Sequence, residues 1–320
     1  MRIPIKIHQL RIGMHVVLPG SWFSHGFVRN SFLIRTKEQL EKIKKSGFLE
    51  VLLDTEKSNP AEEEKKDPTI ENNPLPALID AELLDAIHDD KIPVMERSRL
   101  VNRFCEKVAI GVFENPSRET IQEARKGFHH IVDIILHEEA ILDHLIRITS
   151  HDHYTYTHSV NVGFYAIALV KSMYGRSDAH DLEELGAAFF LHDLGKVMID
   201  QGIINKPARL TDEEMNEMRR HPGHGFKLLQ EAKQLSEEGR IIVLQHHERF
   251  NGSGYPRKLK GDEIHIYGKI CSIADVYDAL TSKRPYRNPL NPFEALKLMR
   301  DEMINHFQED LFEKFVLLFI

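Results

Sequence analysis

The chain has 320 residues and a net charge of −7 at pH 7, a length that allows about two domains and a substantial core. This acidic balance argues against a surface for a nucleic-acid polymer, which would need a basic stripe, although a few local cations can hold a small anion. Cys105 and Cys271 are too few and too far apart for a disulfide scaffold or a thiolate metal site. With no run of 18 apolar residues and no signal-peptide core, we expect a cytoplasmic protein without a membrane span.

Residues 1–55 are typical of a small α+β domain. Three isoleucines alternate with polar residues at its start, which predicts a half-buried strand, and two more strands are expected at 31–34 and 51–53. A short helix should lie between these two, since a capping box begins at Thr36 and Gly47 ends the apolar pattern.

Trp22 is the only tryptophan and lies in the glycine- and aromatic-rich stretch 20–27. As a loop aromatic, it would close the small core of the N-terminal domain. Alternatively, the stretch is a loop that senses a ligand or docks a partner. The sequence leaves both interpretations open.

The rest of the chain is predicted to be mostly α. Residues 56–78 form an expected flexible linker with four prolines, a charge run and no apolar period. Residues 79–149 follow as a helical connecting segment, and 150–320 as a second, all-helical domain. Before residue 149, apolar residues recur at helical spacing over 78–88, 98–113 and 117–148.

His192 and Asp193 directly follow an apolar helical segment, 182–190. Leu185, Phe189 and His192 share one helix face, so His192 should point into the core with Asp193 beside it. A buried imidazole and a buried carboxylate are costly unless a positive charge compensates them, and a divalent metal does so with an ordinary ligand set. Alone, such a pair is more often a core histidine beside a helix-capping aspartate.

His158 and His221 stand at predicted helix starts. His158 opens a helix expected over 155–174, whose apolar stripe continues from the histidine, so its ring should face inward. His221 follows a short helix that begins with a capping box at Thr211, and Pro222 then starts a new helix. Each histidine, taken alone, is more often structural.

His246, His247 and Asp275 complete the set. The two histidines end an apolar helix, and neighbours on a regular helix diverge, so both can reach one centre only near a helix end. Asp275 lies within the apolar helix 270–277, where a carboxylate needs a cation or a strong donor. Five separate helical sites thus present histidine or aspartate, which is enough for two metals with a carboxylate such as Asp193 between them.

A pair of metals can clamp and polarise a phosphodiester and generate hydroxide at neutral pH. Three cations fit such a substrate: Lys196, four residues after His192, and Arg284 and Arg287, which follow the Asp275 helix. Without a metal site, the two arginines would be interpreted as a solvated helix end.

With these motifs, the chain resembles the HD-GYP proteins, a subgroup of the HD superfamily of metal-dependent phosphohydrolases. A bare His-Asp pair is weak support, whereas the His-His-Glu stretch that ends in Gly-Tyr-Pro is specific. Residues 3–58 also resemble the small domain found ahead of some HD-GYP domains. The main resemblance covers about residues 150–310, on the motifs 154–162, 192–196, 221–225, 246–256 and 275–287.

The resemblance implies a catalytic domain that hydrolyses the bacterial second messenger cyclic di-GMP to linear pGpG, or on to GMP. It implies catalytic roles for Asp193 and Lys196. Two divalent metals, usually iron or manganese, would be held by His158, His192, Asp193 and Asp275, and by Asp193, His221, His246 and His247. Substrate would contact Lys196, Tyr255, Arg284 and Arg287. In this group the Gly254-Tyr255-Pro256 loop is also associated with docking of diguanylate cyclase (GGDEF) domains.

Two positions depart from the group. Some members carry a glutamate four residues before the first ligand histidine, which completes a third metal site. Here that position is Tyr154, a poor ligand at neutral pH, so we expect two metals. The usual His-Phe-Asp-Pro run appears as His-Phe-Gln-Glu at 306–309, away from the ligands.

Two alternatives to an active cyclic di-GMP phosphodiesterase stay open. The chain could be a binding or partner-docking signalling module that turns over poorly, and the sequence does not separate this alternative from an active enzyme. It could also be another HD hydrolase that acts on a nucleotide mono- or triphosphate, against which the Gly-Tyr-Pro loop argues.

Overall fold

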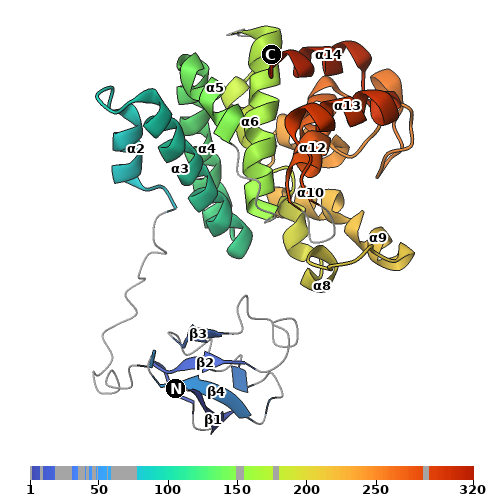
Figure 1. The fold of residues 1–320 in the computed structure, drawn as a ribbon. Coiled ribbons are helices and arrows are strands. Elements are labelled where there is room, and N and C mark those ends of the chain that lie inside the picture. The colour runs from blue at the N-terminus through green and yellow to red at the C-terminus, as the bar shows by residue number, and fades with distance from the viewer. Residues whose placement is uncertain are drawn as a thin grey trace. The chain divides into compact units, whose positions relative to one another are not determined.

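The computed structural model has two compact units, residues 1–75 and 76–320, and each is described by itself (Figure 1). Its elements confirm the predicted fold class: mostly α, with a small N-terminal domain that contains a sheet. The finer division of the chain into four segments stays a prediction. The structure describes residues 2–7, 10–18, 31–34, 40, 43–44, 48, 50–55, 57–58, 78–148, 155–175, 180–283 and 288–320.

In the described part of the N-terminal unit, four strands form an antiparallel sheet with the order β1-β4-β2-β3. The register sets Ile5 opposite Val51 and Val16 opposite Leu53. Val16 and Val51 are buried in a small apolar core of this unit. The strands are β1 (Arg2–Lys6), β2 (His15–Val17), β3 (Ser31–Leu33) and β4 (Glu50–Asp54).

The three predicted strands of this unit are confirmed as β1, β3 and β4, whereas β2 was not predicted. Strand β2 is only three residues long, and just its central side chain is buried, which is too short for a period-two pattern. Leu40 and Ile43 lie in helical backbone, as predicted for the short helix. The predicted helix ends, the Trp22 loop and most of the predicted linker lie outside the described residues.

The second unit is helical, and α6 runs through its middle, between α3–α5 on one side and α12–α14 on the other (Figure 1). Its larger elements are α2 (Ala81–His88), α3 (Val94–Glu114), α4 (Arg118–His137), α5 (Glu139–Ile148), α6 (Thr155–Tyr174), α7 (Leu182–Phe190), α10 (His221–Glu231), α11 (Glu237–Gln245), α12 (Ile266–Thr281), α13 (Pro292–Met303) and α14 (Glu309–Leu317). Shorter elements are η4 (Leu194–Met198), α8 (Gln201–Ile204), α9 (Asp212–Met218), η5 (Gly261–Glu263) and η6 (Ile304–His306).

Helix α6 is buried on all sides from Thr157 to Val170. A helix that is covered all round belongs to the centre of a core, and one apolar cluster extends through the helices packed around it. Because His158 lies in the first turns of this helix, the fold delivers it to the interior of the unit.

The predicted helical stretch 117–148 is interrupted. Helix α4 ends with Glu138 in extended backbone (φ −118°, ψ 92°), and α5 begins at the next residue. The buried Arg97 grips the Glu138 carboxylate with two hydrogen bonds of 2.7 and 2.5 Å. The helix therefore ends at a tertiary contact, and the sequence has no glycine or proline there that would have predicted the end.

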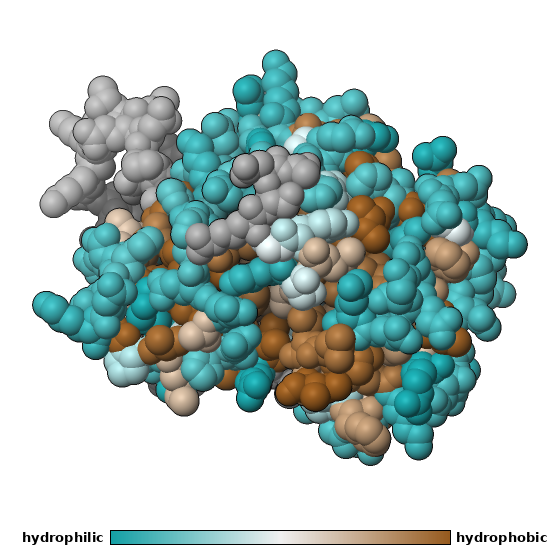
Figure 2. Space-filling model, turned by 90° about the horizontal axis from the view of Figure 1, so that it is seen from above, coloured by the Kyte–Doolittle hydropathy of each residue, from teal (hydrophilic) through white to brown (hydrophobic). Residues whose placement is uncertain are grey.

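The face of the molecule in Figure 2 is largely hydrophilic, and its broadest apolar area lies low in the centre of the view. Large apolar side chains that are exposed in the helical unit include Phe293, Leu317 and Ile320. Within the described part of the chain, every helix is too short or too polar to cross a membrane.

Candidate metal centre

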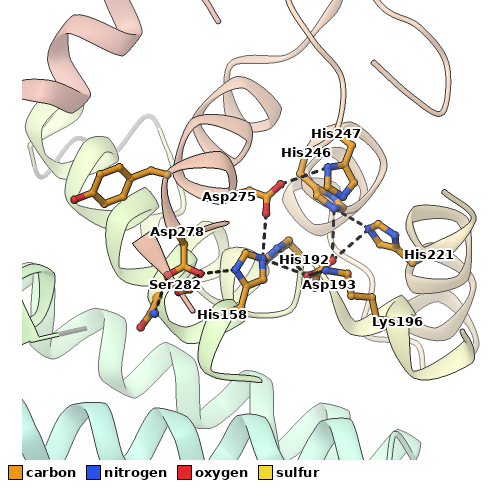
Figure 3. Close-up of polar contacts among 12 residues, drawn as sticks. His158, His192, Asp193, Lys196, His221, His246, His247, Asp275, Asp278 and Ser282 are labelled. Carbon is orange, nitrogen blue, oxygen red and sulfur yellow. Dashed lines mark hydrogen bonds and ion pairs between the residues drawn. The ribbon is translucent and has the colours of Figure 1, made fainter. Parts of the chain in front are cut away.

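The predicted ligands meet at one place in the helical unit, although they come from five parts of the chain (Figure 3). Most stand at helix ends, where the chain can turn a side chain inward. His158 lies near the start of α6, His192 and Asp193 join α7 to η4, His221 begins α10, His246 and His247 follow α11, and Asp275 lies within α12.

Among the described residues, two sets of donor atoms are each compact enough to hold a metal ion, with all atoms of a set within 4.8 Å of one another. We call these sets group 1 and group 2. Group 1 comprises His158, His192 and Asp275, and group 2 comprises Asp193, His221, His246 and His247.

The carboxylate of Asp193 lies between the two groups. Its Oδ2 is 3.5 Å from Nε2 of His158 and 3.5 Å from Nε2 of His192. Its Oδ1 is 3.2 Å from Nε2 of His221 and 3.8 Å from Nε2 of His246. One oxygen therefore faces group 1 and the other faces group 2, which is the geometry that a bridging ligand needs.

Asp275 also has one oxygen toward each group. Its Oδ1 is 3.0 Å from Nε2 of His158, whereas its Oδ2 is 3.3 Å from Nδ1 of His247. The resemblance implies that Asp275 is a ligand of the metal held by His158, and that role stays a prediction. The contact with His247 places the Asp275 carboxylate at the border between the two groups.

Four histidines are oriented by partners on the far side of the ring. Nδ1 lies 2.8 Å from the Phe189 carbonyl in His192, 2.7 Å from the Met218 carbonyl in His221 and 3.0 Å from the Ile242 carbonyl in His246. A carbonyl oxygen only accepts, so Nδ1 carries the proton and Nε2 of the neutral ring keeps a free lone pair. In His158, Nδ1 lies 2.6 Å from the Asp278 carboxylate instead.

The chemistry of the donor set fits a metal ion. His192, Asp193 and His246 are fully buried, and neither Nε2 of His192 nor Oδ1 of Asp193 makes a hydrogen bond within the part of the chain that the structure describes. Buried polar atoms without partners are costly, and a cation in group 1 would satisfy Nε2 of His192 while a cation in group 2 would satisfy Oδ1 of Asp193. Imidazole nitrogens with carboxylate oxygens are ordinary ligands of divalent transition metals.

Protonation in the metal-free protein suits metal binding at most positions. Burial lowers the pKa of His192 to about 4 and that of His221 to about 3, so both rings are neutral at pH 7. Burial alone would raise the pKa of Asp193, but Lys196 and the surrounding histidines hold it well below its usual range. His158 differs: burial opposes its charge, yet Asp275 and Asp278 outweigh burial and raise its pKa to about 9.

Comparisons with known proteins identify the family. The sequence profile of the HD domain matches residues 139–311, more than half of the chain. The chain belongs to the HD-domain family. Within that family it is 33% identical to a cyclic di-GMP phosphodiesterase of Pseudomonas aeruginosa, over 98% of this chain and 75% of that protein. It is 36% identical to a 3′3′-cGAMP-specific phosphodiesterase of Vibrio cholerae, over 50% of this chain and 30% of that protein.

The rest of the chain is also related to known proteins. Residues 2–138 match a profile described as a domain of unknown function. The solved structure of an HDGYP protein from Bdellovibrio bacteriovorus aligns over 100% of this chain and 99% of its own, with a TM-score of 0.64 and 18% identity. At that identity the likeness concerns the fold, and it agrees with the predicted all-helical HD-type domain.

The HD domain places Tyr255 against group 2. The Tyr255 ring stacks on His247 at a centroid distance of 4.6 Å and meets His221 edge-on at 6.4 Å. The buried Glu248 holds the loop behind it, since its carboxylate accepts the amide N–H groups of Arg257 at 2.7 Å and Leu259 at 3.0 Å. Tyr255 is therefore fixed beside the candidate metal ligands, and its role in lining the pocket stays a prediction.

Lys196 donates from its ammonium group to Oδ2 of Asp193, so its charge lies between the two ligand groups (Figure 3). Its neighbour Gly195 packs closely against the backbone of α10: a Cβ added there would overlap the His221 carbonyl and the Gly225 amide. Element η4 thus lies directly against α10. The other predicted substrate residues, Arg284 and Arg287, lie outside the described residues, as does Tyr154.

Three residues near the centre were missed by the sequence analysis. Asp278 follows Asp275 by three residues in an apolar helix, a spacing that puts both on one face and could have identified it. Glu248 directly follows His247, but its role depends on a loop that returns to it. Arg219 lies 5.7 Å from the Tyr255 ring centroid, and only the tertiary structure shows this contact.

Proposed function

We propose that the chain is a metal-dependent phosphodiesterase that hydrolyses cyclic di-GMP in bacterial signalling. The observation that carries the proposal is the Asp193 carboxylate, which turns one oxygen to each of two ligand groups. The named activity of the Pseudomonas relative, which aligns over nearly the whole chain, supports the substrate.

Two divalent ions fit the donor set, one in each group with Asp193 shared. Histidine favours later transition metals and carboxylate favours harder ions, so the mixed set suits iron or manganese. When bound, such a pair polarises a phosphodiester and lowers the pKa of coordinated water. The ligands would be His158, His192, Asp193 and Asp275 for one ion, and Asp193, His221, His246 and His247 for the other.

The protein's own residues hold the substrate and the ligands. The backbone carbonyls behind three histidines keep their Nε2 atoms turned inward. Lys196 brings a positive charge to Asp193, and a phosphate at the centre would lie within its reach. Tyr255 stacks on His247 and would line the substrate pocket beside group 2. Arg284 and Arg287 are proposed to add phosphate contacts.

Arg219 is a further candidate for substrate binding. Its guanidinium lies over the Tyr255 ring, with its carbon 5.7 Å from the ring centroid. A guanidinium that stacks on an aromatic ring still presents N–H groups at its edge, which can bind phosphate. A cyclic dinucleotide has two phosphates, so Arg219 can serve the one that the metals do not hold.

Turnover of purified protein tests the proposal. Protein loaded anaerobically with iron or manganese should convert cyclic di-GMP to pGpG or GMP, and chelation should abolish the reaction. Hydrolysis that survives complete chelation would contradict the metal mechanism. Metal-replete protein that binds the dinucleotide without cleaving it would favour the alternative, a signalling module that turns over poorly.

A second substrate, 3′3′-cGAMP, is a candidate because the Vibrio relative is named for it. The two dinucleotides differ in one base, so the phosphodiester chemistry is the same and only base contacts can discriminate. Comparing kcat/KM for both substrates under identical metal loading decides between them. Docking of a GGDEF domain on the Gly254-Tyr255-Pro256 loop stays a prediction, and a pull-down with such a domain would test it.

A further inference from the structure

His158 is held differently from the other inward-facing histidines. The outer nitrogens of His192, His221 and His246 lie against backbone carbonyls of their own chain segment, three or four residues earlier. The outer nitrogen of His158 lies 2.6 Å from Oδ2 of Asp278, which is 120 residues away on α12. The orientation of this ring therefore depends on one side chain rather than on helix geometry.

Asp278 is itself fixed by several donors. Asn161 donates to Oδ1 at 2.7 Å. Ser282 donates to Oδ2 at 3.1 Å (Figure 3). The carboxylate is 1% exposed, and Asn161 and Ser282 are equally buried. A buried carboxylate is costly without such partners, so the fold maintains a dedicated pocket for this group.

Asp278 stands outside the centre. Its carboxylate faces Nδ1 of His158, whereas Nε2 of the same ring faces Asp193 and Asp275. It is absent from both ligand groups. A carboxylate that accepts from the outer nitrogen of a ligand histidine fixes the ring and makes the inner nitrogen a stronger donor.

We infer that Asp278 is a positioning residue: it holds His158 with Nε2 toward group 1 and sets the affinity of that group for its metal. The inference rests on the proposed metal centre. It predicts an asymmetry, because the outer nitrogens of His221 and His246 in group 2 lie against backbone carbonyls, so group 2 should not depend on Asp278.

The polarity of the network explains why a carboxylate is needed. Three donors, from His158, Asn161 and Ser282, meet on two oxygens, and both oxygens of a carboxylate accept. An amide has one acceptor oxygen and one donor NH2. With Asn161 donating, Asp278→Asn must turn its NH2 toward either Asn161 or His158, and the second choice would force the proton of a neutral His158 onto Nε2.

Metal affinity tests the inference directly. Competition with a chelator should show that Asp278→Ala weakens one of two bound ions by about 10- to 100-fold and leaves the other unchanged. Glu184→Gln is the matched control, since Glu184 is also a buried carboxylate, paired with Arg125 and His129 away from the centre. This control should keep both affinities. Wild-type affinity for both ions in Asp278→Ala would overturn the inference.

A double variant separates positioning from general damage to the fold. Asp278→Asn should lose affinity at group 1, and adding Asn161→Asp should recover part of it, because an acceptor at 161 lets the amide turn its oxygen to His158. A double variant that binds metal no tighter than Asp278→Asn would contradict the polarity argument. Wild-type protein that binds two ions but cleaves no dinucleotide would contradict the proposed function alone. The metal affinities of the variants would still show whether Asp278 positions His158.

Discussion

The two ligand groups lie next to each other, but their histidines are oriented by different kinds of hydrogen-bond partner. In group 2, His221 and His246 are oriented by backbone carbonyls at helix ends, so their positions follow from where α10 and α11 begin and end. In group 1, His158 depends on Asp278, a side chain from a distant helix. Group 1 should therefore be sensitive to single side-chain changes, and group 2 to shifts of helices.

The difference extends to protonation. His221 is kept neutral by burial, whereas His158 faces two carboxylates that favour its charged form in the metal-free protein. A metal entering group 1 must displace a proton, and a metal entering group 2 need not. The same ligand types can thus give two sites with different dependence on pH.

The largest effect is expected where the groups meet. Asp193→Ala removes the carboxylate that turns one oxygen to each group, so both ions should be lost. Turnover should fall by about 1,000-fold or more, because two-metal clamping supplies several kcal/mol. Elemental analysis and turnover measure this. Asp262→Ala, at a fully exposed aspartate, is the control and should keep both ions. Two ions retained in Asp193→Ala would refute the shared carboxylate.

A backbone change should affect group 2 selectively. Gly195→Ala would push η4 against the His221 carbonyl and displace α10, with a loss of about 1–3 kcal/mol in the free energy of unfolding and weaker metal binding at group 2. Gly223→Ala in the same helix is the control, because a Cβ there meets nothing within 4 Å. It should leave metal binding unchanged. Thermal unfolding and metal titration measure the two effects. Equal stability and equal metal affinity of the two variants would contradict the role of the close contact between Gly195 and α10.

Proton release should distinguish the groups next. Because the pKa of His158 is about 9 without metal, filling group 1 at pH 7.5 should release about one proton per ion, and its affinity should fall as the pH falls below 9. Filling group 2 should release none, since burial lowers the pKa values of His221 and His246. Calorimetry in buffers of different ionisation enthalpy measures the release. Equal release for both ions would contradict the assignment.

The smallest effect concerns substrate rather than metal. Arg219→Ala should raise KM for cyclic di-GMP by about tenfold without changing metal content. A tenfold change corresponds to the loss of about one charge-assisted hydrogen bond. Arg220→Ala is the neighbouring control, because Arg220 is exposed and pairs with Glu217 at 3.0 Å. Its KM should stay at the wild-type value. An equal increase of KM in both variants would mean that Arg219 contributes only to the positive charge of this surface and makes no specific contact with the substrate.

The ligand positions could be predicted from sequence because each is a local signal. His158 and His192 continue apolar helical stripes, and a polar side chain in such a stripe is conspicuous. The bounds of α6 and α7 followed from the same periodicity. Asp193 was expected between two metals because the whole set of histidines and aspartates was enough for two ions. Its carboxylate does lie between the two groups, and its role as a bridging ligand stays a prediction.

What the sequence analysis missed depends on contacts between distant segments. The break between α4 and α5 follows from the grip of Arg97 on Glu138, and no local residue marks it. Arg219 reaches Tyr255 only after α9 and the later loop have packed. Asp278 had a local signal, its spacing from Asp275, but its link to His158 spans 120 residues.

A crystal structure of the loaded protein, with anomalous data at the iron or manganese edge, would locate the bound ions. We expect two ions, one on each side of the Asp193 carboxylate. A single ion, or ions that leave Asp193 without a metal contact, would contradict this expectation.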